Sequence, residues 1–183
     1  MSLGAEDRKL LGDIARDSLC AAVEGRRYEP GDPGRPALSE RCGCFVTLKT
    51  AGALRGCLGC FTSEEPLYLT VARYAAYSAT EDPRFVGHRL RPAELPGVEV
   101  EVSVLSPLRP CTEPENIVLG VDGIYVRSGG RSGCFLPQVA TETGWDVEDF
   151  WGHCCRDKAG LDRDAWRGPG VQLMTFTAEA FEA

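Results

Sequence analysis

The hexapeptide at residues 54–59, Leu-Arg-Gly-Cys-Leu-Gly, combines a cation, a thiol and two glycines in a segment that should form a strand. Alternation along an extended chain sends Arg55, Cys57 and Gly59 to one face, with the first two roughly 6.5 to 7 Å apart at the backbone. A cation at that distance favours the thiolate, the form in which cysteine acts as a nucleophile. We therefore predict that Cys57 and Arg55 are catalytic, with Cys57 as a nucleophile or redox thiol.

The two glycines indicate a close approach to the backbone, because interior glycines weaken a strand and often mark such an approach. We predict that Gly56 and Gly59 admit a substrate. The alternative is a packing role, in which Cys57 is a small packed residue and Arg55 pairs with an acid across the sheet.

Cysteine spacing raises a metal site as another alternative. Cys42, Cys44, Cys57 and Cys60 offer four thiolate ligands, the donor set that structural zinc prefers. Along a strand, however, Cys57 and Cys60 point to opposite faces, which does not suit a tetrahedral site. We predict free thiols at these positions, no metal and no cofactor.

A second polar cluster follows at Asp82-Pro83-Arg84-Phe85, where the chain must leave helical geometry because of the proline. Asp82 and Arg84 either hold this turn together as an ion pair or form a polar site for an anionic ligand, and the sequence favours the ion pair. The chain has two histidines, His88 and His153, and no pairing of either with Cys57 is indicated.

Composition narrows the class of protein. The net charge of -7 disfavours binding to nucleic acid, since each neutralised phosphate needs a local cation. No apolar run approaches the roughly 20 residues that span a bilayer, and the N-terminus carries acids where a secretory signal would be basic and apolar. Nine cysteines without such a signal are typical of a reducing compartment. We predict a cytoplasmic protein without membrane contact.

The elements that position the hexapeptide can be read from periodicity. Apolar residues at three-to-four spacing predict a helix over residues 5–24, followed by a proline-rich and glycine-rich loop. Residues 42–49 and 54–61 read as a hairpin whose return arm carries the hexapeptide. Ser63 is expected to cap a helix that ends near Glu81, and residues 98–104 alternate as a half-buried strand.

The second half of the chain is predicted to contain short strands and one helix. Residues 117–119 and 124–127 read as strands joined by a turn, and residues 128–133 read as a hairpin tip. Asp146 is placed to cap a helix that ends at Gly160, and residues 171–181 read as a closing strand. Helices and hairpins without a βαβ rhythm indicate an α+β fold with mainly antiparallel pairing and flanking helices.

Five motifs, in this order along the chain, resemble the AMMECR-type domain family, whose bacterial members are labelled protein A of the AmmeMemoRadiSam system. They are Leu54-Arg55-Gly56-Cys57-Leu58-Gly59, Asp82-Pro83-Arg84-Phe85, Val102-Ser103-Val104-Leu105, Phe135-Leu136-Pro137-Gln138-Val139 and Lys158-Ala159-Gly160-Leu161. The resemblance covers nearly the whole chain. It implies one domain over residues 1–183, built from a larger and a smaller lobe that are intertwined around a cleft near the hexapeptide.

The resemblance implies partners more firmly than a reaction. It implies a Memo-like protein and a radical-SAM protein as partners, and it assigns Asp82, Arg84 and Gln138 to motif positions that we expect to bind substrate with the two glycines. Our leading hypothesis is an enzyme that uses the cleft-lining Arg55-Gly56-Cys57 strand on a small-molecule or peptide substrate. The alternatives are a non-catalytic binding module for a ligand or protein and, disfavoured by charge, an RNA-binding protein.

Overall fold

The computed structural model describes residues 3–183. They form two compact units: the first runs up to Leu105 and includes Glu179–Ala183, and the second is Ser106–Ala178. Both units combine helices or helical turns with antiparallel strands, which confirms the predicted α+β class. The cleft and the single domain over residues 1–183 stay predictions.

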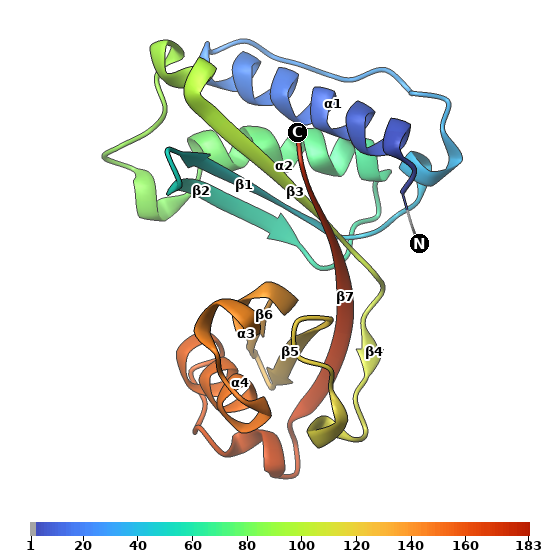
Figure 1. The fold of residues 1–183 in the computed structure, drawn as a ribbon, viewed down its shortest axis with the longest axis vertical. Coiled ribbons are helices and arrows are strands. Elements are labelled where there is room, and N and C mark those ends of the chain that lie inside the picture. Colours follow the sequence, from blue (N-terminus) through green and yellow to red (C-terminus); the bar gives the residue numbers. More distant parts are fainter. Residues whose placement is uncertain (1–2) are drawn as a thin grey trace. The chain divides into compact units, whose positions relative to one another are not determined.

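The first unit contains a small antiparallel sheet in which β2 is the outer strand and β1 is its neighbour (Figure 1). Its strands are β1 (Cys44–Thr50), β2 (Ala53–Cys60) and β3 (Val98–Leu105), and the end of β7 (Gln172–Glu182) follows β3 in the strand order. The turn between β1 and β2 uses Ala51 and Gly52, both with positive φ (49° and 76°). Two such residues are typical of the tight hairpin turn, so the predicted hairpin is confirmed.

Two helices cover one face of this sheet (Figure 1). They are α1 (Ala5–Val23) and α2 (Leu67–Thr80). Helix α2 packs on β1 and β2, and α1 packs on α2 and β3. Alternate residues of β1, such as Val46 and Leu48, are fully buried beneath Val71 and Ala75 of α2. The helix side of the sheet is therefore the core of this unit, and the opposite face is less buried.

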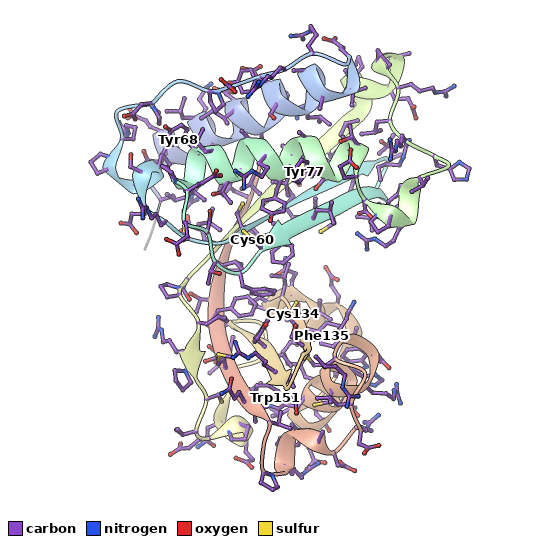
Figure 2. All side chains as sticks on the ribbon, turned by 180° about the vertical axis from the view of Figure 1, so that it is seen from behind. Cys60, Tyr68, Tyr77, Cys134, Phe135 and Trp151 are labelled. Atoms are coloured by element: carbon purple, nitrogen blue, oxygen red, sulfur yellow. The ribbon has the colours of Figure 1, made fainter. Side chains whose placement is uncertain are left out.

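The second unit is built on the hairpin β5–β6, with β7 beside β5. Its elements are β4 (Arg109–Pro110), β5 (Asp122–Ser128), β6 (Arg131–Phe135), α3 (Pro137–Thr143), α4 (Val147–His153) and the π-helical turn Cys154–Lys158. Aromatic residues fill its core, among them Phe135 and Trp151 (Figure 2). The buried indole of Trp151 donates a hydrogen bond to the Pro114 carbonyl at 3.0 Å.

Short 3₁₀ turns connect these elements. They are Pro36–Ser39, Pro83–Phe85, Pro92–Gly97, Pro114–Asn116 and Ala165–Arg167. All but the last begin with proline, whose fixed φ suits a first helical position and whose missing N–H is no loss there.

Three predicted elements need correction. Ser63 does not cap a helix, because α2 begins at Leu67 and the Ser63 hydroxyl instead accepts a hydrogen bond from the Glu65 N–H at 3.1 Å. Residues 117–119 form no strand, and β5 begins at Asp122. Helix α3 was not expected at all. By contrast, Asp146 caps α4 as predicted by accepting from the Asp149 N–H at 2.8 Å.

A membrane-spanning helix is not found among residues 3–183, since none combines the needed length with enough apolar residues.

Candidate functional site

The hexapeptide forms most of β2, the outer strand of the first unit's sheet. Gly56 faces α2 and is buried, whereas Cys57 lies on the opposite face and is half-buried. Cys57 is the register partner of Thr47 on β1, and the Thr47 hydroxyl donates to its Sγ at 3.2 Å. From Gly56 to Cys60 the strand follows the predicted alternation, but a bulge interrupts it at Arg55, because Leu48 and Lys49 pair with Gly56 and Leu54 and leave Arg55 unpaired in the register.

The carboxylate of Asp82 binds the backbone of the hexapeptide. Its Oδ2 accepts a hydrogen bond from the Cys57 N–H at 2.9 Å, and its Oδ1 accepts from the Arg84 N–H at 3.0 Å. The Asp82 side chain is only 1% exposed. Hydrogen bonding to Arg84, with help from these two backbone N–H groups, lowers the pKa of Asp82 to about 2. This carboxylate is therefore ionised at neutral pH although it is buried.

Arg84 joins the same group from the turn that follows α2. Its Nε and Nη2 donate to the two carboxylate oxygens of Asp82 at 3.0 and 2.7 Å, and Nη2 also donates to the Cys57 carbonyl at 3.0 Å. The Asp82 carboxylate raises the pKa of Arg84 most, and a Cys57 thiolate raises it further. The guanidinium is thus fixed beside Cys57, while its side chain stays 54% exposed.

Arg55 points to a different partner. Its Nη1 donates to Glu94 Oε1 at 2.8 Å, and its Nη2 donates to the His88 carbonyl at 3.3 Å. Hydrogen bonds first from Arg55 and then from Arg91 lower the pKa of Glu94 to about 2. Arg55 thus pairs with an acid, whereas Arg84 is the arginine bonded to the backbone of Cys57, and the catalytic role of Arg55 stays a prediction. Arg55 also holds the segment that follows the turn of Arg84.

The glycines of the hexapeptide are explained by packing. A Cβ on Gly56 would lie 1.9 Å from the Ser78 carbonyl oxygen of α2. A Cβ on Gly59 would lie 2.2 Å from the Cys44 carbonyl oxygen and 2.5 Å from the ring of Phe45. Protein atoms therefore occupy the space that a Cβ would need at either position. Packing therefore accounts for both glycines, and the substrate-binding role of Gly56 and Gly59 stays a prediction.

Ser78 is a site residue that the sequence reasoning did not assign. Its buried hydroxyl accepts a hydrogen bond from the Leu58 N–H at 2.9 Å and donates to the Val46 carbonyl at 2.8 Å. It thereby connects α2 to both β1 and β2 at the hexapeptide. The available signal was a polar residue on the otherwise apolar face of α2, where a buried hydroxyl needs partners.

The cysteines around the hexapeptide do not gather into a metal site. Cys44 and Cys60 are register partners on the side of the sheet that faces α2, and burial raises the pKa of Cys44 well above its usual value. Burial also raises the pKa of Cys42 to about 11. Within residues 3–183 no group of three or more His, Cys, Asp or Glu side chains could hold a metal ion. The zinc alternative therefore has no support from the described geometry.

Two remaining candidates belong to the second unit. Gln138 lies in α3, and its carbonyl accepts from the Thr141 hydroxyl at 2.8 Å. His153 stacks on Trp145 with ring centroids 4.0 Å apart, and its Nδ1 lies 2.7 Å from Asp157 Oδ2. The substrate-binding role of Gln138 stays a prediction. His88, in the first unit, exposes its side chain and offers only its carbonyl to Arg55.

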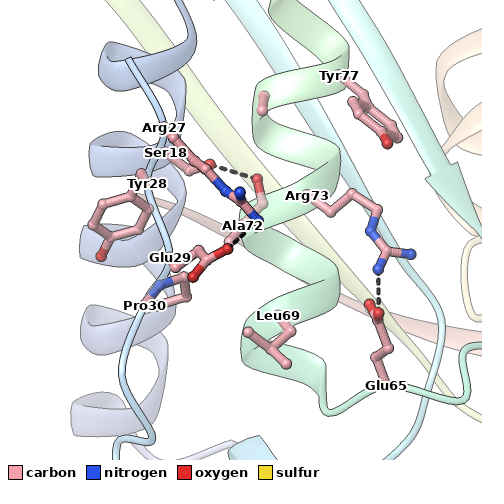
Figure 3. Close-up of a pocket in the computed structure, with 11 residues that line it drawn as sticks. Ser18, Arg27, Tyr28, Glu29, Pro30, Glu65, Leu69, Ala72, Arg73 and Tyr77 are labelled. Carbon is pink, nitrogen blue, oxygen red and sulfur yellow. Dashed lines mark hydrogen bonds and ion pairs between the residues drawn. The ribbon is translucent and has the colours of Figure 1, made fainter.

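A separate cavity of about 660 Å³ lies in the first unit, bordered by α1, residues 27–30 and α2 (Figure 3). Two ion pairs line it, Arg27 with Glu29 and Arg73 with Glu65. No predicted site residue lines this cavity, so it is not part of the group around Cys57.

Fold and site together define an α+β protein in which an Asp-Pro-Arg turn is bonded to a thiol-bearing outer strand. The model of the AMMECR1 family matches residues 12–181. The chain belongs to this family, as the resemblance of its motifs predicted.

Solved and sequenced relatives support the same assignment. A protein from Thermococcus gammatolerans is 43% identical over 92% of this chain and 86% of its own length. One from Methanothermobacter thermautotrophicus is 43% identical over 98% of this chain and 95% of its own. The crystal structure of "Uncharacterized Protein PH0010" from Pyrococcus horikoshii is similar with a TM-score of 0.86 and 39% identity, covering 94% of this chain and 89% of that one.

Proposed function

We propose that the protein is an enzyme of the cytoplasm that acts through the thiolate of Cys57 on a small-molecule or peptide substrate with an anionic group. One observation carries the proposal: the Thr47 hydroxyl donates to the Cys57 sulfur, and the Arg84 guanidinium is held at the carbonyl of the same residue, where it interacts with the thiol. A hydrogen-bond donor and a cation both stabilise negative charge on sulfur.

Each residue of the site has a distinct part in this proposal. The Cys57 thiol gives its proton to water, and the thiolate attacks an electrophilic carbon of the substrate. A sulfur–carbon bond forms, and the displaced group leaves with its electron pair. The exposed side of Arg84 binds the anionic group of the substrate, while Asp82 fixes the orientation of Arg84. Memo-like and radical-SAM proteins are the proposed partners.

A non-catalytic binding module is the second candidate, and the glycines favour it. Because protein atoms fill the space around Gly56 and Gly59, the hexapeptide does not need a substrate to explain it. Such a module could not simply add a partner strand at Cys57, since Asp82 and Arg84 already occupy the N–H and carbonyl at this edge. RNA binding is a third candidate that the net charge of -7 disfavours.

Alkylation of the folded protein tests the enzyme proposal. Iodoacetate and iodoacetamide react with thiols by the same displacement, but only iodoacetate carries a carboxylate. If Arg84 binds anions beside Cys57, the ratio of the two rate constants, iodoacetate over iodoacetamide, should be roughly threefold higher at Cys57 than at Cys111. Mass spectrometry resolves each cysteine, and Cys111 is a suitable reference because it is also half-buried and burial raises its pKa.

The same experiment has an outcome that contradicts the enzyme proposal. If Cys57 reacts no faster than Cys20 and Cys111 with either reagent at neutral pH, the enzyme proposal should be dropped and the binding module retained.

A further inference from the structure

The segment after Asp82 is basic in an acidic protein. Residues 84–91, which we call the basic loop, contain three arginines, one histidine and no acidic residue, whereas the whole chain has a net charge of -7. Arg84 is 54% exposed and Arg91 is 81% exposed. Within residues 3–183 the exposed side chain of Arg89 has no acidic partner. Arg84 pairs with Asp82 and Arg91 with Glu94, so the uncompensated positive charge of the loop is that of Arg89.

The basic loop also exposes an apolar side chain. Val86 is 63% exposed, the largest exposed fraction among the exposed large apolar residues of the described chain. Phe85 beside it is half-buried, and its ring lies 5.7 Å from the Arg84 guanidinium carbon. Arginine and apolar side chains at one exposed place are typical of a surface that binds another molecule.

The hexapeptide holds this loop in a defined position. At the start of the loop, Asp82 and Arg84 bond to the backbone of Cys57. In its middle, the His88 carbonyl accepts from Arg55. Near its end, Leu90 is buried in the core of the first unit. A loop fixed at three points loses little conformational entropy when it binds a partner.

Arg55 further connects the hexapeptide to the end of the loop. Glu94 accepts hydrogen bonds from Arg55 through one carboxylate oxygen and from the N–H and side chain of Arg91 through the other. Its charge is shared between Arg55 and Arg91, and Asp82 balances Arg84, so neither acid compensates the charge of Arg89. The role of the hexapeptide arginine is thus to position a basic, partly apolar loop.

We propose that the basic loop is a docking surface for an acidic peptide segment of a partner protein, with an apolar side chain of that segment packed on Val86. Charge complementarity selects this occupant, because the loop itself contains no acidic residue, Arg89 has no acidic partner among the described residues, and the 63% exposed side chain of Val86 offers an apolar contact. A nucleic acid fits less well, since the rest of this acidic chain would repel its phosphates. The proposal does not rest on the chemistry of Cys57.

Binding of short labelled peptides to the full chain, followed by fluorescence anisotropy, tests the proposal. The probes are a peptide of glutamate and aspartate around one leucine, the same peptide with serine for leucine, the same with lysine for the acids, and a single-stranded RNA. The acidic leucine peptide should bind best. Its affinity should fall as salt rises from about 0.02 to about 0.3 M, over which the screening length shortens several-fold.

Two variants with matched controls locate the surface. Arg89→Glu should weaken the acidic leucine peptide roughly tenfold, equivalent to about 1.4 kcal/mol, and Val86→Ser should remove its advantage over the serine peptide. Arg127→Glu makes the same charge change on β5, and Val118→Ser changes a similarly exposed valine, so both should bind like the parent. Cys57→Ser should also bind normally, which separates this proposal from the enzyme proposal.

Three results would overturn the proposal. They are equal binding of the acidic and lysine peptides, an Arg89→Glu affinity that matches Arg127→Glu, and tighter binding of RNA than of the acidic leucine peptide.

Discussion

Replacing Gly56 by alanine is expected to lower the free energy of unfolding by about 3 kcal/mol or more, or to prevent folding. The added Cβ would lie 1.9 Å from the Ser78 carbonyl oxygen and 2.9 Å from its carbonyl carbon. Both are backbone atoms of α2, and the Ser78 hydroxyl is itself bonded to β1 and β2. Neither side can move without separating the helix from the sheet, so a side chain at this position cannot be accommodated cheaply.

Urea unfolding measures this effect when the free energies of unfolding of Gly56→Ala and of the control Gly31→Ala are compared. A Cβ on Gly31 would meet nothing within 4 Å, so this control removes a glycine without a clash and should stay within about 0.5 kcal/mol of the parent. The packing account of the hexapeptide fails if Gly56→Ala is as stable as Gly31→Ala. The same result would restore the idea that Gly56 is kept for a ligand.

Asp82→Asn is expected to cost about 2 kcal/mol of stability at neutral pH, because the buried carboxylate accepts hydrogen bonds that are stronger when the acceptor is charged. The Asp82 carboxylate accepts from the N–H groups of Cys57 and Arg84 and from the Arg84 guanidinium. Asparagine keeps the size of the side chain but has no charge to balance that guanidinium. The variant should therefore loosen the turn that holds the basic loop.

The same carboxylate should make stability depend on pH in the acid range. Its pKa falls from an ordinary 3.8 to about 2 on folding, so the folded state favours the ionised form. The resulting stability, about 2 kcal/mol, is fully present above the ordinary value of 3.8 and is lost as pH falls through 2. Urea midpoints of the parent should decline over this window, and those of Asp82→Asn should decline less.

Asp13→Asn is the matched control for this experiment. Asp13 forms an exposed i,i+4 ion pair with Lys9, and exposed pairs of this kind contribute little. The urea midpoint of Asp13→Asn should match that of the unsubstituted protein at every pH. If Asp82→Asn and the parent lose stability in parallel as pH falls from about 4 to about 2, the buried carboxylate is not the group that titrates.

In the first unit, the elements that could be predicted from the sequence are those with a clear hydrophobic periodicity. Val98, Val100 and Val102 alternate with polar residues, and β3 follows that pattern. The first residue of α2 could not be predicted from such a pattern. Ser63 has the type and spacing of a helix cap, but its hydroxyl bonds locally to Glu65 and Thr70. The helix then begins only after Pro66.

The site shows why side-chain partners are harder to predict than strands. Alternation could not place Arg55, because this residue lies at a bulge in β2, and a sequence pattern does not say where a long, flexible side chain ends. Its acid, Glu94, is 39 residues away, and Arg84 reaches Cys57 from 27 residues away through a turn. Such contacts depend on the path of the chain after α2. The ion pair between Asp82 and Arg84 was predictable because it is local, and it is confirmed.

We propose that Arg84, and not Arg55, is the cation that acts on the Cys57 thiol. The most direct test is the rate constant of Cys57 alkylation by iodoacetate in Arg84→Met and in Arg55→Met, with the folded state of each variant checked by urea unfolding. Loss of Arg84 should slow the reaction roughly threefold or more, and loss of Arg55 should leave it within about twofold of the parent. A reaction slowed by Arg55→Met and unchanged in Arg84→Met would contradict the account.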